Sequence, residues 1–468
     1  MSRYATKDSW NITSMDSPKQ IACFIQLDEQ ELEHIKWGYV PAQMEEKWFA
    51  YFDHGWLHLH RSWTGFEMYK AEIVLAGGSY VINSFCTERN TEKYANTNDE
   101  VDIQTFCFLI ARMLLHIDVS KLKTKEVLTQ KNGIIDAWSR YGNLILKDPQ
   151  RLIDNCIKSA LFGIAVGDAL GVPHEFSRSE DLQENPVTNM VGYGTYDLPP
   201  GTWSDDSSLT FCLAESLCSG FNTDHMGELF VRWYYQDYWT ATGDVFDIGI
   251  GTRNALNKIK NGTKAEFAGG QDEKDNGNGS LMRILPLVFA IQNLPIEERF
   301  ERTRKVSAIT HGHIRAVMAC FYYLEFAKQL IEGKSKFEIY NDLQTALSSF
   351  FKKEGIDSTE LAHFDRLLQN NIADLPLSEI RSGGYVIETI EACSWCLLTT
   401  DNYKDAVLKA VNLGHDTDTT AAVTGGLAGL LYGFDEIPQE WVEKLARVGD
   451  IEGLANKLAA AINSLSFY

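Results

Sequence analysis

The stretch LIDNCIKSALFGIAVGDALG, residues 152–171, decides the fold of most of this chain. Its apolar residues recur at helical spacing, and Gly163, Gly167 and Gly171 fall on one face of the expected helix. Because glycine has no side chain, such a face lets the backbone of a second helix approach closely. The stretch therefore predicts a buried helix that packs tightly against a partner helix.

Similar helical patterns with small residues continue toward the C-terminus. They include SLTFCLAESLCS (208–219), GHIRAVMACFYYLEFAKQLIEG (312–333) and TTAAVTGGLAGLLYG (419–433). No convincing pair of strands interrupts them. Residues 151–468 are therefore predicted to form one all-α domain.

The first 120 residues differ from the rest of the chain in composition and hydrophobic pattern. They are rich in aromatic residues and short β-prone runs, as in KWFAYFDHGWLHLHRSW (47–63), where apolar and polar residues alternate from Trp56 to His60. A helical pattern follows at 101–117. Residues 1–120 therefore predict a small α+β accessory module, and residues 121–150 a linker between the two domains.

Composition and charge narrow the possible functions. Lys and Arg number 43 against 64 Asp and Glu, a formal net charge of −21, which argues against nucleic acid and anionic membranes as partners. No signal peptide and no membrane-spanning run are expected, so the predicted location is cytoplasmic. The nine cysteines are scattered, and Cys393 and Cys396 form a single CxxC pair. We expect reduced core cysteines rather than disulfides or a metal site.

The first chemical signal is the run WSDDSSLT, residues 203–210. Asp205 and Asp206 are adjacent carboxylates behind the hydroxyl of Ser204, at the start of an apolar helical pattern. One polar residue in this position is explained by capping of the free N–H groups of the first turn. A second carboxylate adds like-charge repulsion that capping does not require, so metal binding stays open beside capping.

The second signal is HDTDTT, residues 415–420, ahead of a pattern rich in small residues. Asp416 and Asp418 alternate with hydroxyls, among them that of Thr419. An N-cap with an Asx turn could explain this cluster as well, but two such clusters favour a shared role. Carboxylate and hydroxyl oxygens are the ligands that Mg²⁺ or Mn²⁺ prefers. Since four carboxylates brought together would repel one another, we expect cations between them.

Two further carboxylates belong to the glycine-faced helix and to the segment that follows it. Glu175 follows Pro173 in the segment GVPHE (171–175) and is a candidate mobile catalytic or metal-gating carboxylate. Asp168 lies on the glycine-faced helix itself. We interpret Asp168 as a buried hydrogen-bonding residue that orients neighbouring loops.

Three loops could contact a ligand. NGNGSLMR (276–283) leaves backbone N–H groups free to approach a diphosphate or ribose, although a plain turn would give the same sequence. THGH (310–313) places histidines at the start of a helix, and SGGYV (382–386) offers an aromatic ring on which a purine could stack. The candidate ligand-binding residues are Gly277, Asn278, Gly279, Ser280, His311, Gly384 and Tyr385.

The order of these motifs resembles the ADP-ribosylglycohydrolase family over roughly residues 152–433. This resemblance implies an all-α domain with two Mg²⁺ or Mn²⁺ ions that removes ADP-ribose from modified protein side chains. Arginine is the favoured linkage, because an acidic rim attracts a guanidinium. The resemblance implies Glu175, Asp205 and Asp206 as catalytic residues. The metal ligands that it implies are Ser204, Asp205, Asp206, Asp416, Asp418 and Thr419.

One departure from the family pattern is visible, because many members have Thr-Asp-Asp-Thr where this chain has Ser204 to Ser207. Both changes keep the hydroxyl, so the ligand set is expected to survive. The module at 1–120 lies outside the family core. It resembles the extension of members that act as immunity proteins against secreted ADP-ribosyltransferase toxins, which implies a toxin as partner beside ADP-ribosylated protein and ADP-ribose. The alternatives are a catalytically silent, binding-only inhibitor and a structural protein on the same fold.

Overall fold

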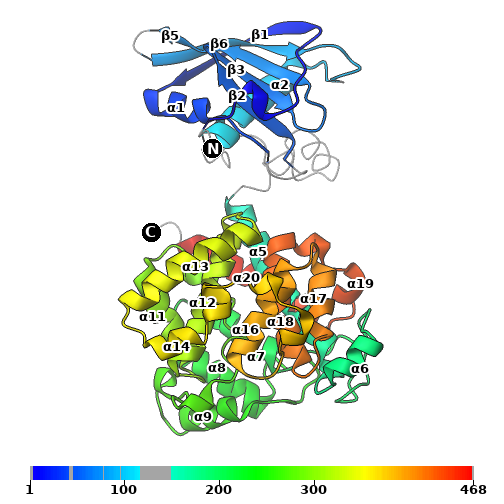
Figure 1. Cartoon of the computed structure of the whole chain (residues 1–468), viewed down its shortest axis with the longest axis vertical. Coiled ribbons are helices and arrows are strands. Elements are labelled where there is room, and N and C mark those ends of the chain that lie inside the picture. The colour runs from blue at the N-terminus through cyan, green and yellow to red at the C-terminus, as the bar shows by residue number, and fades with distance from the viewer. Residues whose placement is uncertain (1–3, 42–45, 77–78, 95, 116–148, 466–468) are drawn as a thin grey trace. The chain divides into compact units, whose positions relative to one another are not determined.

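The chain divides into two compact units, Met1–Leu152 and Ile153–Tyr468 (Figure 1). The computed structural model describes residues 4–41, 46–76, 79–94, 96–115 and 149–465. The predicted linker, 121–150, lies outside the described residues except for its last two, which begin a helix.

The N-terminal unit is built on an antiparallel sheet of six strands, ordered β1-β6-β4-β3-β2 with β5 paired to β6. The strands are β1 (Pro18–Leu27), β2 (Trp48–Asp53), β3 (Trp56–Arg61), β4 (Glu67–Glu72), β5 (Val74–Ala76) and β6 (Ser79–Glu88). The helices are α1 (Glu29–Trp37) and α2 (Asp99–Phe108), and a π-helical turn, Leu109–Leu114, continues α2. The predicted α+β module is confirmed.

Helices α1 and α2 cover one face of this sheet (Figure 1). In β3, Leu57 and Leu59 are fully buried in the core that the helices cover, while the intervening His58 lies on the opposite face. Phe85 of β6 stacks on Phe106 of α2 with ring centroids 4.2 Å apart. The period-two alternation at 56–60 is therefore that of a strand with one face packed on helices, as predicted.

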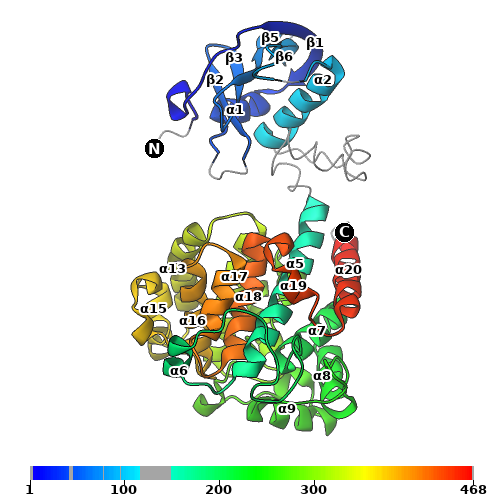
Figure 2. The same cartoon turned by 90° about the vertical axis from the view of Figure 1, so that its right-hand side faces the viewer.

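The C-terminal unit is helical, and no strand occurs among its described residues, 153–465. Figure 2 shows α17 beside α18, with α5 and α7 nearby. The helices are α5 (Pro149–Gly171), α6 (Ser179–Glu184), α7 (Asp205–Leu217), α8 (Thr223–Gln236), α9 (Ile250–Lys260), α10 (Leu287–Ile291), α11 (Ile296–Ser307), α12 (Ile314–Ile331), α13 (Lys336–Lys353), α14 (Ser358–Ala362), α15 (Asp365–Leu368), α16 (Val386–Leu398), α17 (Tyr403–Val411), α18 (Thr417–Tyr432), α19 (Gln439–Val442) and α20 (Val448–Leu465). The predicted all-α domain is confirmed.

Glycine residues allow α5 and α18 to pack in close contact. A Cβ added at Gly163 would lie 2.3 Å from the carbonyl oxygen of Gly425, and one at Gly167 would lie 2.1 Å from that of Ala421. Real side chains never approach backbone atoms so closely, so any other residue would push the helices apart. The predicted glycine face is confirmed, and it sets the C-terminal end of α5 beside the start of α18.

One helix corrects an expectation from the sequence. In the part of the chain that the structure describes, Ile153–His174 is long and apolar enough to cross a membrane by length and composition alone, although no such run was expected. Within its apolar window, 89% of the residues are buried inside the structure. That burial is typical of a core helix, and α5 has this role in the C-terminal unit.

All nine cysteines are free thiols. Cys393 and Cys396, the CxxC pair, are fully buried on α16. Burial raises the pKa of Cys393 to about 12, so the thiolate that a metal or redox role needs is disfavoured. The expected core position holds for Cys156, Cys212, Cys320, Cys393 and Cys396, whereas Cys23, Cys86, Cys107 and Cys218 are half-buried.

Candidate active site

Helix α7 begins at the first acidic cluster. Ser204 is its N-cap, and the Ser204 hydroxyl accepts a hydrogen bond from the backbone N–H of Asp206 at 3.3 Å. Asp205 and Asp206 follow as buried residues of the first turn. Capping accounts for one hydrogen bond of Ser204, whose role as a metal ligand stays a prediction, and it leaves the two carboxylates behind Ser204 to be explained.

Helix α18 begins at the second cluster without a side-chain cap. Asp416 occupies the N-cap position, but its carboxylate makes no capping hydrogen bond. Its Oδ2 instead accepts from the side-chain amide of Asn278 at 2.8 Å. Asp418 is buried, and its Oδ1 accepts from the backbone N–H of Thr419 at 2.9 Å. Capping does not explain this cluster.

The two clusters meet in the structure. The Thr419 hydroxyl, from α18, donates to Oδ1 of Asp206, from α7, at 3.2 Å. One carboxylate oxygen from each of Asp168, Asp206 and Asp418 lies within 4.8 Å of the other two. Residues that are distant in the sequence thus form one acidic cluster, and three helices contribute to it.

A second group of carboxylates adjoins the first. Glu175, Asp247 and Asp418 also have oxygens within 4.8 Å of one another, so Asp418 belongs to both groups. The Tyr196 hydroxyl donates to Oε2 of Glu175 at 2.5 Å. Glu175 therefore lies at the acidic cluster, as the sequence predicted.

The electrostatics of the cluster favour a bound cation. Burial raises the pKa of Asp206 and Asp418 well above the usual range, and neighbouring carboxylates raise both further. The Oδ2 atoms of these two residues are buried and have no hydrogen-bond partner. Because a buried carboxylate oxygen without a partner is costly, a divalent cation would both satisfy these atoms and offset the repulsion. The residues present fit such an ion.

Asp168 has the orienting role that we predicted. Its carboxylate accepts hydrogen bonds from the backbone N–H groups of Ser204 and Ser207, each at 2.9 Å, and from the Ser207 hydroxyl at 2.6 Å. Burial raises its pKa to about 6 although these bonds lower it. The contacts tie α5 to the first turn of α7 and so position the first acidic cluster.

A cavity of about 600 Å³ opens over both clusters, a size that suits a small-molecule ligand. Its acidic lining residues are Glu175, Asp205, Asp247, Asp275 and Asp416. Other predicted site residues that line it are Gly277, Asn278, Gly279, His311, Gly384 and Thr419. Ser204, Asp206 and Asp418 are buried and do not line it. The cavity thus brings the loops at 276–279 and 384 to the acidic cluster.

Two predicted ligand-binding residues do not line this cavity. Ser280 is fully buried, and its hydroxyl accepts from that of Ser307 at 2.9 Å. Tyr385 is half-buried at the N-cap of α16, and its hydroxyl accepts from Arg315 at 3.1 Å. A ligand role for either residue stays a prediction.

The glycines of the loop at 276–279 also pack against the ring of His311. A Cβ at Gly279 would lie 2.7 Å from Cε1 of His311, and one at Gly277 would lie 3.4 Å from Nε2. Burial lowers the pKa of His311 to about 4, so the ring is neutral at pH 7. These glycines therefore make room for the imidazole while their backbone lines the cavity.

Sequence reasoning missed Asp247 and Tyr196. Both lie in loops outside any recognised motif, and Asp247 has a left-handed backbone conformation, with φ at 47°. Burial, and then the charge of Asp416, raises the pKa of Asp247 to about 6. Single residues in irregular loops carry no periodic or spacing signal, so only the folded structure reveals them.

In the C-terminal unit, the acidic N-termini of α7 and α18 meet beneath a ligand-sized cavity. This arrangement is that of a candidate metal-dependent hydrolase. The profile of the ADP-ribosylglycohydrolase family matches residues 148–466, and the chain belongs to this family. The resemblance that the motifs indicated is confirmed.

Relatives and solved structures agree with this assignment. The chain is 36% identical over 305 residues to the ADP-ribosylarginine hydrolase Tri1 of Serratia proteamaculans (strain 568), covering 64% of this chain and 78% of the relative. It is 29% identical over 293 residues to the ADP-ribosyl-[dinitrogen reductase] glycohydrolase of Rhodospirillum rubrum, covering 61% and 88%. A solved structure described as an ADP-ribosylglycohydrolase-related protein complex matches with a TM-score of 0.56 at 32% identity, covering 66% of this chain and 99% of that one.

Proposed function

We propose that this chain is a divalent-cation-dependent hydrolase that removes ADP-ribose from modified arginine side chains of proteins. The observation that carries the proposal is the pair of buried, unpartnered oxygens, Asp206 Oδ2 and Asp418 Oδ2, beside a ligand-sized cavity. Family membership supports the hydrolase activity. The relative named as an ADP-ribosylarginine hydrolase supports the linkage.

Two Mg²⁺ or Mn²⁺ ions belong to this proposal. Two groups of three carboxylates that share Asp418 favour two ions over one. When bound, such ions would supply Lewis-acid polarisation of substrate oxygens. The residues that we propose hold them are Ser204, Asp205, Asp206, Asp416, Asp418 and Thr419.

Glu175 is the carboxyl that we propose exchanges a proton with the reacting groups. It lines the cavity and accepts a hydrogen bond from Tyr196. Burial, and then the charge of Asp247, raises the pKa of Glu175 to about 8, so its carboxyl can take up and release a proton near neutral pH. Asp205 also lines the cavity, whereas Asp206 does not. Asp205 is therefore better situated than Asp206 to contact substrate.

A neighbouring cavity of about 730 Å³ supports the arginine linkage. It shares Asp247 with the active-site cavity. Among the described residues, its lining holds one cation, Arg253, against three carboxylates and four aromatic rings: Asp237, Asp244, Asp247, Tyr196, Tyr234, Tyr235 and Phe246. A guanidinium pairs with carboxylates and stacks on aromatic rings, so this lining suits an arginine that leaves as ADP-ribose is released.

Arginine-linked ADP-ribose is expected to be released at least about a hundredfold faster than serine-linked ADP-ribose, because an uncharged hydroxyl leaves guanidinium-pairing groups unsatisfied. The measurement is chromatography of free ADP-ribose after incubation with each modified protein. Equal or faster release from serine would overturn the arginine assignment. Absence of release from either substrate would overturn the hydrolase itself and favour the catalytically silent alternative.

We further propose that the N-terminal unit contacts an ADP-ribosyltransferase toxin, which would make the chain an immunity protein. The unit has a core of its own, and among its described residues the large apolar side chains of Tyr4, Phe24, Val40, Trp63 and Leu75 are exposed, the most exposed being Phe24 at 70%. Burial of such side chains against a partner would stabilise the complex. In the ADP-ribose release assay, a chain that lacks residues 1–148 should keep the rate of the full chain. The same shortened chain should lose any direct inhibition that the full chain exerts on the transferase. Unchanged inhibition would contradict this role.

A further inference from the structure

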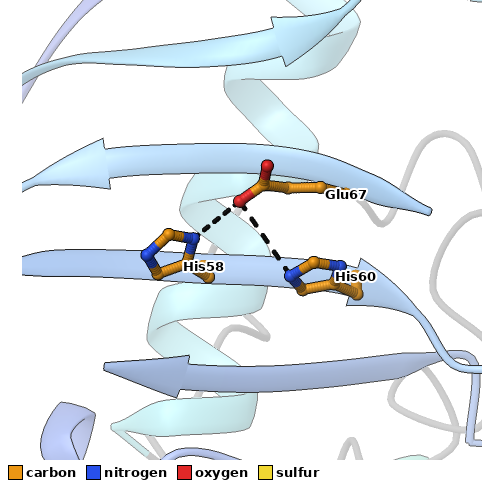
Figure 3. Close-up of side chains that lie close together, drawn as sticks. All are labelled: His58, His60 and Glu67. Atoms are coloured by element: carbon orange, nitrogen blue, oxygen red, sulfur yellow. Dashed lines mark hydrogen bonds and ion pairs between the residues drawn. The ribbon is translucent and has the colours of Figure 1, made fainter. Parts of the chain in front are cut away.

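Two histidines and a glutamate converge on the face of the N-terminal sheet opposite α1 and α2 (Figure 3). His58 and His60 lie two residues apart on β3, so both point to the same face. Glu67 begins the neighbouring strand β4, where the register pairs it with His60. The sheet therefore presents two imidazoles and one carboxylate together.

The distances between these groups are those of a nearly formed metal site. Oε1 of Glu67 lies 2.6 Å from Nδ1 of His58 and 3.9 Å from Nε2 of His60, and the three atoms all lie within 4.8 Å of one another. Around a tetrahedral ion with metal–ligand distances of about 2.0–2.1 Å, ligand atoms are roughly 3.3 Å apart. The observed separations bracket that value, so small side-chain rotations suffice.

His60 has a buried nitrogen without a partner. Its Nδ1 lies 2.9 Å from the carbonyl oxygen of Gly65, which can only accept, so Nδ1 carries the hydrogen and Nε2 presents a lone pair. Nε2 is buried and makes no hydrogen bond. A buried lone pair beside a carboxylate is left unsatisfied, and a cation bound between the two groups would satisfy both.

The surrounding backbone orients two of the three side chains, His60 and Glu67. Gly65, whose carbonyl orients His60, has a left-handed backbone conformation with φ at +71°, and a Cβ there would lie 2.2 Å from the carbonyl oxygen of Asn11. The backbone N–H of Met15 donates to Oε2 of Glu67 at 3.4 Å. Metal-binding histidines usually donate their second N–H to a carbonyl or carboxylate, as His60 does.

We propose that His58 Nδ1, His60 Nε2 and Glu67 Oε1 bind one transition-metal ion of the zinc class, which links β3 to β4. Two imidazole nitrogens and a carboxylate favour Zn²⁺ over Mg²⁺ or Ca²⁺, which take oxygen ligands. The His58 side chain is 12% exposed, which leaves solvent a path to the fourth position. Coordination through Nδ1 of His58 would replace its hydrogen bond to Glu67. The site does not depend on the function proposed for the C-terminal unit.

Cobalt titration of the metal-stripped full chain tests this site. Four-coordinate Co²⁺ with nitrogen ligands absorbs visible light much more strongly than Co²⁺ among six oxygens, so the acidic clusters contribute little to the signal. We expect a strong band whose full intensity corresponds to one four-coordinate Co²⁺ per chain and which is abolished by added Zn²⁺. His58→Ala and Glu67→Gln should each weaken Co²⁺ binding at least about tenfold.

Two variants serve as controls for the band. His54→Asn changes a histidine of the same unit whose side chain is 94% exposed, and Asp418→Asn changes the acidic cluster; both should keep the band. Circular dichroism checks folding, and the isosteric Glu67→Gln decides the outcome if His58→Ala does not fold. Absence of a strong band from the wild-type chain, its persistence at full affinity in Glu67→Gln, or its loss in Asp418→Asn would each overturn the site.

Discussion

Asp418→Asn is expected to lower kcat/KM for ADP-ribose release at least about a thousandfold, a loss of about 4 kcal/mol of transition-state stabilisation. Asp418 is the residue that both carboxylate groups share, so its charge supports cation binding at both. Asparagine keeps the size of the side chain, and the fold should therefore survive. Initial rates of release over a range of substrate concentrations measure the effect.

Although Asp418→Asn should lower activity, it should raise the stability of the chain when no metal is present. Burial and the neighbouring carboxylates oppose the charge on Asp418, so in chelator the Asp418→Asn chain should melt at a higher temperature than the wild type. Asp435→Asn, an exposed carboxylate of the same unit, should change neither the rate nor the melting temperature. A rate for Asp418→Asn within tenfold of the wild type would contradict its role.

Gly171→Ala is expected to destabilise the C-terminal unit by about 1–3 kcal/mol and to lower the hydrolase rate with it. A Cβ at Gly171 would lie 2.3 Å from both Cα and N of Asp418. Its carbonyl also accepts from the Thr417 hydroxyl at 2.7 Å. The first turn of α18 must therefore move, and the second acidic cluster moves with it. Urea denaturation measures the loss of stability.

Gly453→Ala is the matched control for that substitution. Gly453 lies within α20, and a Cβ there would meet nothing within 4 Å. Alanine is the better helix former, so this variant should gain about 0.5–1 kcal/mol and keep its activity. Equal stability of the two variants would mean that α5 and α18 do not pack as closely as their glycines indicate.

Much of the C-terminal unit was predictable from local patterns. Glycine spacing at 163 and 167 marked the packed face of α5, and apolar periodicity beginning directly after 203–206 and 415–418 marked the starts of α7 and α18. Spacing alone could not predict that Asp206 and Asp418 meet, because their contact depends on how distant helices pack. The family resemblance supplied that expectation.

Other features depend on long-range packing that sequence patterns do not record. Ser280 belongs to the glycine-rich motif, yet it faces the core rather than the cavity, because a loop sequence does not say which side is buried. In the N-terminal unit, alternation predicted β3, but the approach of Glu67 to His58 depends on the register between β3 and β4. Pairing of β6 with both β1 and β4 is likewise non-local.

The most direct test of a cation-dependent site at Asp206 and Asp418 is ADP-ribose release from arginine-modified protein by the full chain before chelation, after chelation and after metal is restored. We expect chelation to reduce the rate to that of Asp418→Asn, and Mg²⁺ or Mn²⁺ to restore it in the wild type alone. A fully chelated chain that releases ADP-ribose at its original rate would contradict the account.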